Sequence, residues 1–179
     1  KISASKIAVM KAAVVKSDSV MQHMLPIHPM AALVLKNIAS AFQSNQRSMF
    51  DFIKTPKDLD VHAFQWFIQN TRPDSDRSLL TVDMLWDFFY EKGKDYLTSD
   101  IKLILDTYPQ QTNLTEKEKV ILKTILIMQA VDQRLGGTIP VLKATDQNLS
   151  YAFEGDWDVY ENECKGFETA LTKWGSIKT

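Results

Sequence analysis

The sequence predicts an all-α protein, a multi-helix bundle of about eight helices. Apolar side chains recur at three- and four-residue spacing along most of the chain, which is the period of an amphipathic helix. Helix-start signals precede several of these apolar stretches. The 179 residues include only six glycines, fewer than the turns of a strand-rich fold usually need. The expected helices cover residues 3–16, 29–43, 47–54, 55–71, 81–97, 99–108, 115–135, 138–153 and 156–174.

The first strong helix begins at Pro29. Proline suits the first helical position, because its missing N–H has no helical partner there, and His28 takes the cap position before it. The apolar face of this helix is wide, which predicts burial on more than one side. A weaker pattern predicts a helix over 3–16, and a short helix from Arg47 to Lys54 follows a polar break.

Two further helices are expected before the middle of the chain. Thr55 and Pro56 form a second start signal, a cap followed by a first helical position. This helix should end ahead of Pro73, since the residue before a proline is biased away from helical geometry. Thr81 starts the most aromatic helix, which closes near Leu97.

The helices of the second half follow the same logic. Ser99 begins a short helix that Pro109 stops. Thr115 and Glu118 have the spacing of a capping box, in which each side chain bonds the backbone N–H of the other. The long helix that follows should end at a Gly-Gly pair.

The linker between Pro109 and Thr115 predicts two domains, a lid-like helical domain over 1–109 and a helical subdomain over 115–179. A helix that starts at Pro140 and a last helix complete the second one. This order of helices and turns leaves open that the subdomain is a helix-turn-helix or an incomplete winged-helix unit.

Composition excludes several classes of protein. With 45% hydrophobic and 24% charged residues the chain is globular, and a net charge of −1 argues against a domain that mainly holds a nucleic-acid backbone. The single cysteine, Cys164, fits a reducing cytosol, so a cytoplasmic location is expected. No apolar run approaches the ~18 residues of a membrane span. Because the chain begins with Lys, we expect it to be a fragment of a longer protein.

The sequence lacks the motifs of common catalytic sites. It has no Gly-x-x-x-x-Gly-Lys-Ser/Thr phosphate loop and no Gly-x-Gly-x-x-Gly. The three histidines share no metal-ligand spacing, so no metal site is predicted. Asp83 and Asp87 lie one helical turn apart, as acids on a solvated helix face often do. Core packing is expected for the large aromatic residues Trp66, Trp86, Phe88, Phe89, Trp157 and Trp174.

One stretch carries a family resemblance. It reads Leu-x-x-His-Pro, about a dozen mostly apolar residues, Phe, a polar turn, and Asn-x-Arg-Ser-x-Phe-x-Phe. The matching residues are Leu25, His28, Pro29, Leu33, Leu35, Phe42, Asn45, Arg47, Ser48, Phe50 and Phe52. This pattern resembles a helical segment that follows the nucleotide-binding core of large bacterial P-loop ATPases, including those of anti-phage defence systems of the BREX and phage-growth-limitation type. A weaker similarity follows at 140–153.

The resemblance implies a non-catalytic regulatory segment of a larger ATP-binding protein. ATP and Mg²⁺ would belong to the parent chain, whose nucleotide-binding core is the expected partner, and the fragment itself would hold no cofactor. Arg47 is the main candidate for a nucleotide contact, since guanidinium pairs well with phosphate, and Asn45 and His28 accompany it. A carboxylate on a neighbouring helix is the alternative partner for Arg47, and a cap or packing role is the alternative for His28.

Three other arginines are weaker candidates for a phosphate contact. Arg72 and Arg77 lie in a polar loop, where Asp74 and Asp76 are their expected partners. Arg134 lies near the end of the long helix.

Two other functions remain open from the sequence. The chain could be a helical protein–protein interaction or scaffold module with no link to a nucleotide. Alternatively, the region 115–179 could bind DNA, although the near-neutral net charge disfavours it.

Overall fold

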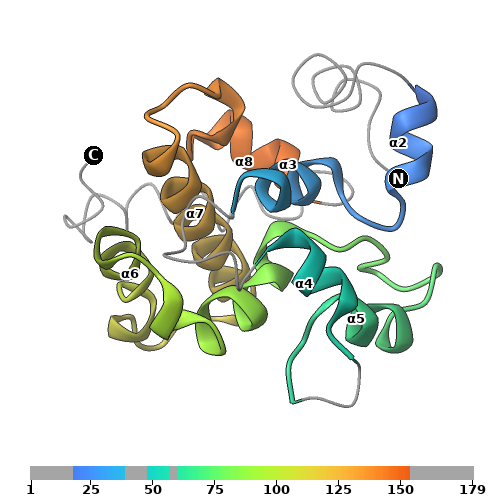
Figure 1. Ribbon diagram of the computed structural model, residues 1–179, viewed down its shortest axis with the longest axis horizontal. Coiled ribbons are helices and arrows are strands. Elements are labelled where there is room, and N and C mark those ends of the chain that lie inside the picture. Colours follow the sequence, from blue (N-terminus) through green and yellow to red (C-terminus); the bar gives the residue numbers. More distant parts are fainter. Residues whose placement is uncertain (1–17, 39–47, 57–59, 154–179) are drawn as a thin grey trace.

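The computed structural model describes residues 18–38, 48–56 and 60–153. These residues form a helical fold (Figure 1), so the prediction of an all-α bundle of about eight helices is confirmed. The α-helices are α2 (Asp18–Met24), α3 (Pro29–Ile38), α4 (Met49–Lys54), α5 (Phe64–Asn70), α6 (Ser99–Leu105), α7 (Glu116–Arg134) and α8 (Asp146–Ala152). Short helical turns join them: η2 (Val82–Leu85), η3 (Asp87–Glu91), η4 (Lys94–Tyr96), η5 (Tyr108–Gln110) and η6 (Pro140–Leu142). The helices expected over 3–16 and 156–174 lie outside the described residues, and the second of them is the last helix of the predicted helix-turn-helix or winged-helix unit.

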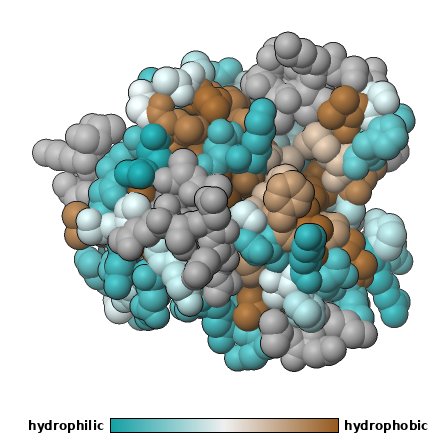
Figure 2. Space-filling model, in the orientation of Figure 1, coloured by the Kyte–Doolittle hydropathy of each residue, from teal (hydrophilic) through white to brown (hydrophobic). Residues whose placement is uncertain are grey.

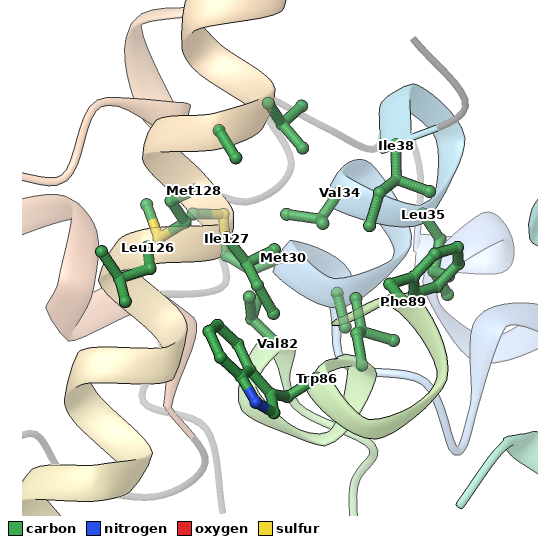
Figure 3. Packing of buried hydrophobic residues seen from close by; sticks show 14 of the residues in the cluster. Met30, Val34, Leu35, Ile38, Val82, Trp86, Phe89, Leu126, Ile127 and Met128 are labelled. Carbon is green, nitrogen blue, oxygen red and sulfur yellow. The ribbon is translucent and has the colours of Figure 1, made fainter. Parts of the chain in front are cut away.

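One hydrophobic core holds the described residues together. Helix α7 packs against η2, α6 and α3. Figure 3 shows Ile127 of α7 beside Met30 of α3. The wide apolar face of α3 is buried, as the sequence predicted, and much of α7 is buried as well. The ranges predicted as separate domains, 1–109 and 115–179, therefore share one core over their described residues. Its largest fully buried side chains include Trp86, Phe52, Phe88, Phe153 and Met30.

The start of α3 is tied to the start of η2. The backbone N–H of His28 donates to Leu80 O at 2.9 Å, and the N–H of Leu80 donates to Pro26 O at 2.9 Å. These two bonds form an isolated parallel bridge between Ile27 and Leu80. The bridge satisfies backbone groups that burial would otherwise leave without water, and it places two distant segments side by side.

The second start signal was misassigned. Thr55 does not begin a helix; it ends α4, since its N–H and its hydroxyl both donate to Asp51 O. Helix α5 begins at Phe64, after an extended Ala63. The start of α4 does follow a capping box, formed by Ser48 and Asp51. A threonine followed by a proline can stand at either end of a helix. Here Thr55 stands at the carboxyl end of α4.

The segment expected as one α-helix over 81–97 is irregular. A 3₁₀ turn at η2 leads into a π-helical turn at η3, where the N–H of Lys92 donates to Asp87 O at 2.9 Å. Side chains on most sides of this segment are buried, including Trp86 and Phe89. Tertiary packing therefore sets its backbone, overriding the local helical preference.

In the second half α6 starts at Ser99 as predicted but ends at Leu105, ahead of the turn η5 that contains Pro109, and α7 runs close to its predicted bounds. The capping box of Thr115 and Glu118 is present at the start of α7. Gly136 and Gly137 end it with φ values of 61° and 70°, the left-handed geometry that glycine adopts without strain. The helix predicted over 138–153 is instead split into η6 and α8.

The split between η6 and α8 has a local cause. Thr145 caps α8 by accepting a hydrogen bond from the N–H of Asn148 at 3.3 Å. The Asn148 amide donates to Pro140 O and Lys143 O, both at 2.8 Å. One side chain thereby satisfies two carbonyl groups of the connecting turn.

Candidate functional site

A cleft of about 580 Å³ opens between α5, the loop 71–77, η2 and α7. Its volume lies within the range of roughly 300–1,000 Å³ that is usual for ligand sites. Its inner surface is apolar, with Ala63, Phe67 and Leu80 buried. Charged and aromatic side chains line the rest, which makes this cleft the candidate functional site.

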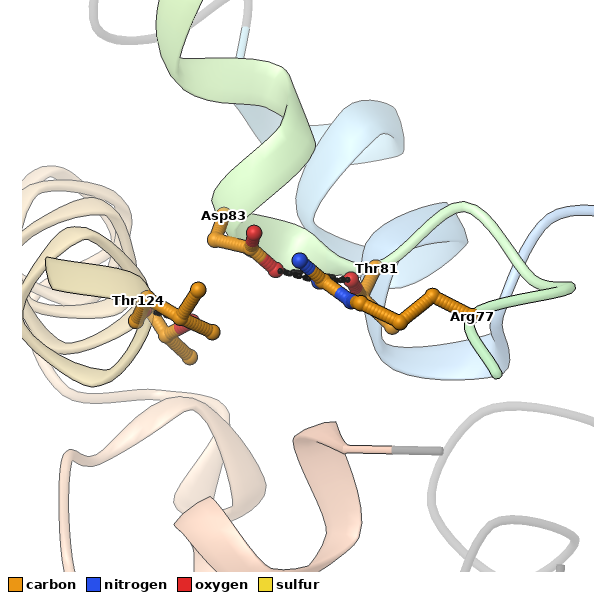
Figure 4. A network of polar contacts seen from close by, with 5 residues as sticks. Arg77, Thr81, Asp83 and Thr124 are labelled. Atoms are coloured by element: carbon orange, nitrogen blue, oxygen red, sulfur yellow. Dashed lines mark hydrogen bonds and ion pairs between the residues drawn. The ribbon is translucent and has the colours of Figure 1, made fainter. Parts of the chain in front are cut away.

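An arginine–aspartate pair lines one side of the cleft. Figure 4 shows the polar contacts of this pair. The Arg77 guanidinium donates to Asp83 Oδ1 at 2.7 Å and to Thr81 Oγ1 at 2.6 Å. The Thr81 hydroxyl donates to the same Asp83 oxygen at 2.7 Å. The expectation that Arg77 pairs with Asp74 or Asp76 was wrong, because Asp83 offers a less exposed partner.

The predicted solvated pair of acids is also corrected. Asp83 is buried, with only 8% of its surface exposed. Asp87 accepts a hydrogen bond from the backbone N–H of His62 at 2.6 Å. Both acids therefore position other segments around the cleft: Asp83 holds the loop, and Asp87 holds the approach to α5.

Two aromatic groups form the wall on the α5 side. The rings of His62 and Trp66 stack with their centroids 3.9 Å apart and an interplanar angle of 18°. Both side chains line the cleft, and Trp66 is half-buried. This wall therefore presents a flat aromatic surface beside the carboxylate of Asp87.

The α7 side contributes a lysine above two rings. Lys123 Nζ lies 5.1 Å from the Tyr108 ring centroid and 5.9 Å from that of Trp86, within cation–π range. The buried Trp86 donates from Nε1 to Glu91 Oε1 at 2.9 Å. Tyr90 packs against Trp86, and burial together with a hydrogen bond to Asp106 raises the pKa of Tyr90 well above its ordinary value.

The aromatic residues that were expected in the core are buried, except Trp66 on the cleft wall and Trp157 and Trp174, which lie outside the described residues.

Removing the Arg77 side chain should loosen the loop and lower stability. We expect Arg77→Ala to reduce the free energy of unfolding by about 1–3 kcal/mol, because a buried carboxylate loses its charged partner. Urea unfolding monitored by circular dichroism measures this as a lower midpoint with an unchanged slope. Arg72→Ala, in the same loop, is the matched control and should stay within about 0.5 kcal/mol of the parent. Equal losses in both variants would contradict the role of the Arg77–Asp83 pair.

Of the residues predicted to contact a nucleotide, only His28 lies within the described part of the chain, and it does not line this cleft. His28 is 1% exposed, and its Nδ1 accepts a hydrogen bond from the N–H of Met30 at 3.2 Å. Its side chain thus caps α3 from a buried position, which is the alternative role named for it. Asn45 and Arg47 lie outside the described residues. Arg134, a weaker candidate, lies 3.4 Å from Asp100 Oδ2.

The sequence held partial signals for the cleft. His62 and Trp66 are four residues apart, as are Arg77 and Thr81. Those spacings indicate that the two residues of each pair lie close together. No sequence pattern indicates that both pairs line the same cleft. The cleft also needs Lys123, which is distant from both in the sequence.

Compared with protein-family models, with curated proteins and with solved structures, the chain has no match. None of the helices in the described part of the chain combines the length and apolar character needed to cross a membrane. Within the same residues, no group of three or more His, Cys, Asp or Glu side chains is placed to hold a metal ion.

Proposed function

We propose that this chain is a non-catalytic helical regulatory segment of a larger bacterial ATP-binding protein, in which it couples the nucleotide state to partner modules. The observation that supports the proposal is that some apolar residues of the ATPase-like stretch are buried in the core while others are exposed at the surface. Its apolar positions Leu33, Leu35 and Phe52 are buried in the core. Core packing therefore accounts for these positions without any nucleotide.

Other positions of the same stretch have no such explanation. Phe50 is 63% exposed on α4 although Phe52, two residues later, is fully buried. Leu25 is 61% exposed. On the face drawn in Figure 2, hydrophobic side chains reach the surface between hydrophilic ones. Exposed apolar residues within the stretch fit contact with another part of the parent protein, such as its nucleotide-binding core.

Arg47 carries the proposed link to the nucleotide. It belongs to the segment that joins α3 to α4. An arginine that reaches the γ-phosphate stabilises the charge of the phosphoryl-transfer transition state. ATP and Mg²⁺ would be bound by the parent chain, and Asn45 would assist Arg47.

Mutation of Arg47 in the full-length parent protein tests this role. We expect Arg47→Ala to lower kcat for ATP hydrolysis by about 10³-fold or more, the effect of losing such an arginine. Lys54→Ala, an exposed basic residue on α4, is the control and should leave turnover unchanged. Thermal unfolding of each variant separates a folding defect from a catalytic one. Unchanged turnover in Arg47→Ala would overturn the proposed contact.

A helical protein–protein interaction module is the second candidate function. The observation that favours it is the cleft beside α5, which combines an apolar inner surface with charged and aromatic walls. Such a site can bind a partner whether or not the parent hydrolyses ATP. Pull-down with the cleft intact and with Trp66 replaced by leucine would identify a partner that depends on the cleft.

A further inference from the structure

The two cations of the cleft are already engaged within the chain. Arg77 is bound to Asp83 and Thr81. Lys123 lies over the rings of Trp86 and Tyr108. A ligand that entered the cleft as an anion would have to compete with these contacts.

The acidic groups of the cleft are less fully engaged. Asp76 is exposed and makes no hydrogen bond or ion pair with any of the residues that the structure describes. Asp87 accepts one backbone hydrogen bond, from His62, through Oδ2. A carboxylate has about four acceptor sites, so Asp87 can accept further donors. Because Arg77 neutralises Asp83, the carboxylates that remain to bind a ligand are Asp76 and Asp87, and they favour a positively charged group.

The aromatic wall points to the same kind of ligand. Trp66 is stacked by His62 on one face and remains half-buried, so part of its ring is open to the cleft. Guanidinium is planar, stacks on aromatic rings and donates to carboxylates in pairs. The ammonium group of lysine lacks the planar stacking and the paired donors.

We propose that the cleft between α5, the loop 71–77, η2 and α7 binds an arginine side chain carried by a segment of a partner protein. The guanidinium lies against Trp66 and donates to Asp87 and Asp76, and the aliphatic part of the side chain covers the apolar inner surface. The inference rests on the proposed role of the chain as a non-catalytic regulatory segment that couples to partner modules, and it names the chemistry of one partner.

The probe is N-acetyl-arginine amide, titrated into the ¹⁵N-labelled chain at millimolar concentrations. The indole N–H signal of Trp66, assigned with Trp66→Phe, reports binding directly. N-acetyl-lysine amide and N-acetyl-glutamate amide are the comparison ligands. We expect the arginine amide to bind more tightly than the lysine amide, and we expect no shift of the cleft signals with the glutamate amide.

Three variants locate the interaction. Asp76→Asn and Asp87→Asn should each weaken arginine binding by about threefold, as expected for a partly exposed ion pair. Asparagine at position 87 keeps an acceptor for the His62 N–H, so the wall is preserved. Trp66→Leu should remove the preference for arginine over lysine, because it removes the ring. Asp95→Asn, an exposed acid outside the cleft, is the matched control and should change nothing.

Two results would overturn the inference. One is the absence of shifts at cleft residues with millimolar arginine amide. The other is equal or stronger binding of the glutamate amide, which would show that Lys123 and Arg77 dominate the cleft. Neither result affects the ATP-turnover test of Arg47, so failure of the cleft proposal and failure of the proposed function are distinguishable.

Discussion

Replacing Gly93 with alanine is expected to lower the free energy of unfolding by about 3 kcal/mol. A Cβ atom at this position would lie 2.5 Å from Phe89 O and 3.0 Å from Phe88 O. Both are backbone atoms of the π-helical turn η3, so no side chain can move aside to relieve the contact. The backbone of Gly93 itself is unstrained, with φ of −121°, and the whole cost is therefore steric. Urea unfolding of the parent protein and of Gly93→Ala measures this difference in the free energy of unfolding.

Gly136→Ala is the matched comparison, because its cost comes from the backbone conformation and not from a steric contact. Gly136 has φ of +61°, and a Cβ atom added there would meet nothing within 4 Å. Only the left-handed backbone opposes alanine there, at about 1 kcal/mol. If Gly136→Ala proved as damaging as Gly93→Ala, the close backbone approach at η3 would not be the reason for the glycine.

Removing the indole of Trp86 should have the largest effect of any single change in the core. We expect Trp86→Ala to cost about 3–5 kcal/mol of the free energy of unfolding. The side chain is 1% exposed, and its ring packs against Tyr90 and Tyr108 with centroids 4.5 and 4.8 Å away. The truncation leaves a cavity between η2 and α7 and removes the hydrogen bond to Glu91.

Two further variants separate the contributions of Trp86. Trp86→Phe keeps an aromatic ring but loses the N–H, and it should cost clearly less than the alanine variant. Leu103→Ala removes a side chain that is 75% exposed on α6, and it should stay within about 0.5 kcal/mol of the parent. A loss for Trp86→Ala as small as that for Leu103→Ala would show that Trp86 does not organise the core. Denaturant midpoints of all three are directly comparable.

Sequence reasoning succeeded where a feature depends on residues close together in the chain. The capping box of Thr115 and Glu118 needs only residues three apart, and it begins α7 as expected. The left-handed end of α7 needs only glycine at 136 and 137. The apolar stripes of α3 and α7 likewise follow from helical spacing, so the all-α class was predictable.

Local signals failed where a side chain had two possible partners. Thr81 was expected to start a helix, and it does precede the 3₁₀ turn η2, but without a side-chain cap bond, because its hydroxyl is bound to Arg77 and Asp83. Thr55 was expected to begin a helix and instead closes α4. In both cases the geometry of the folded chain chooses between alternatives of similar local energy.

The sequence by itself determined the helical class, the strongest caps and the burial of the apolar stripes. Only the tertiary structure decided the irregular course of η2 and η3, the pairing of Arg77 with Asp83, and the cleft. The physical reason is distance along the chain. Caps and stripes arise from neighbours within one or two helical turns, whereas the cleft unites α5, the loop 71–77 and Lys123 of α7. Burial of the shared core brings these segments together, and their contact cannot be predicted from short stretches of the sequence.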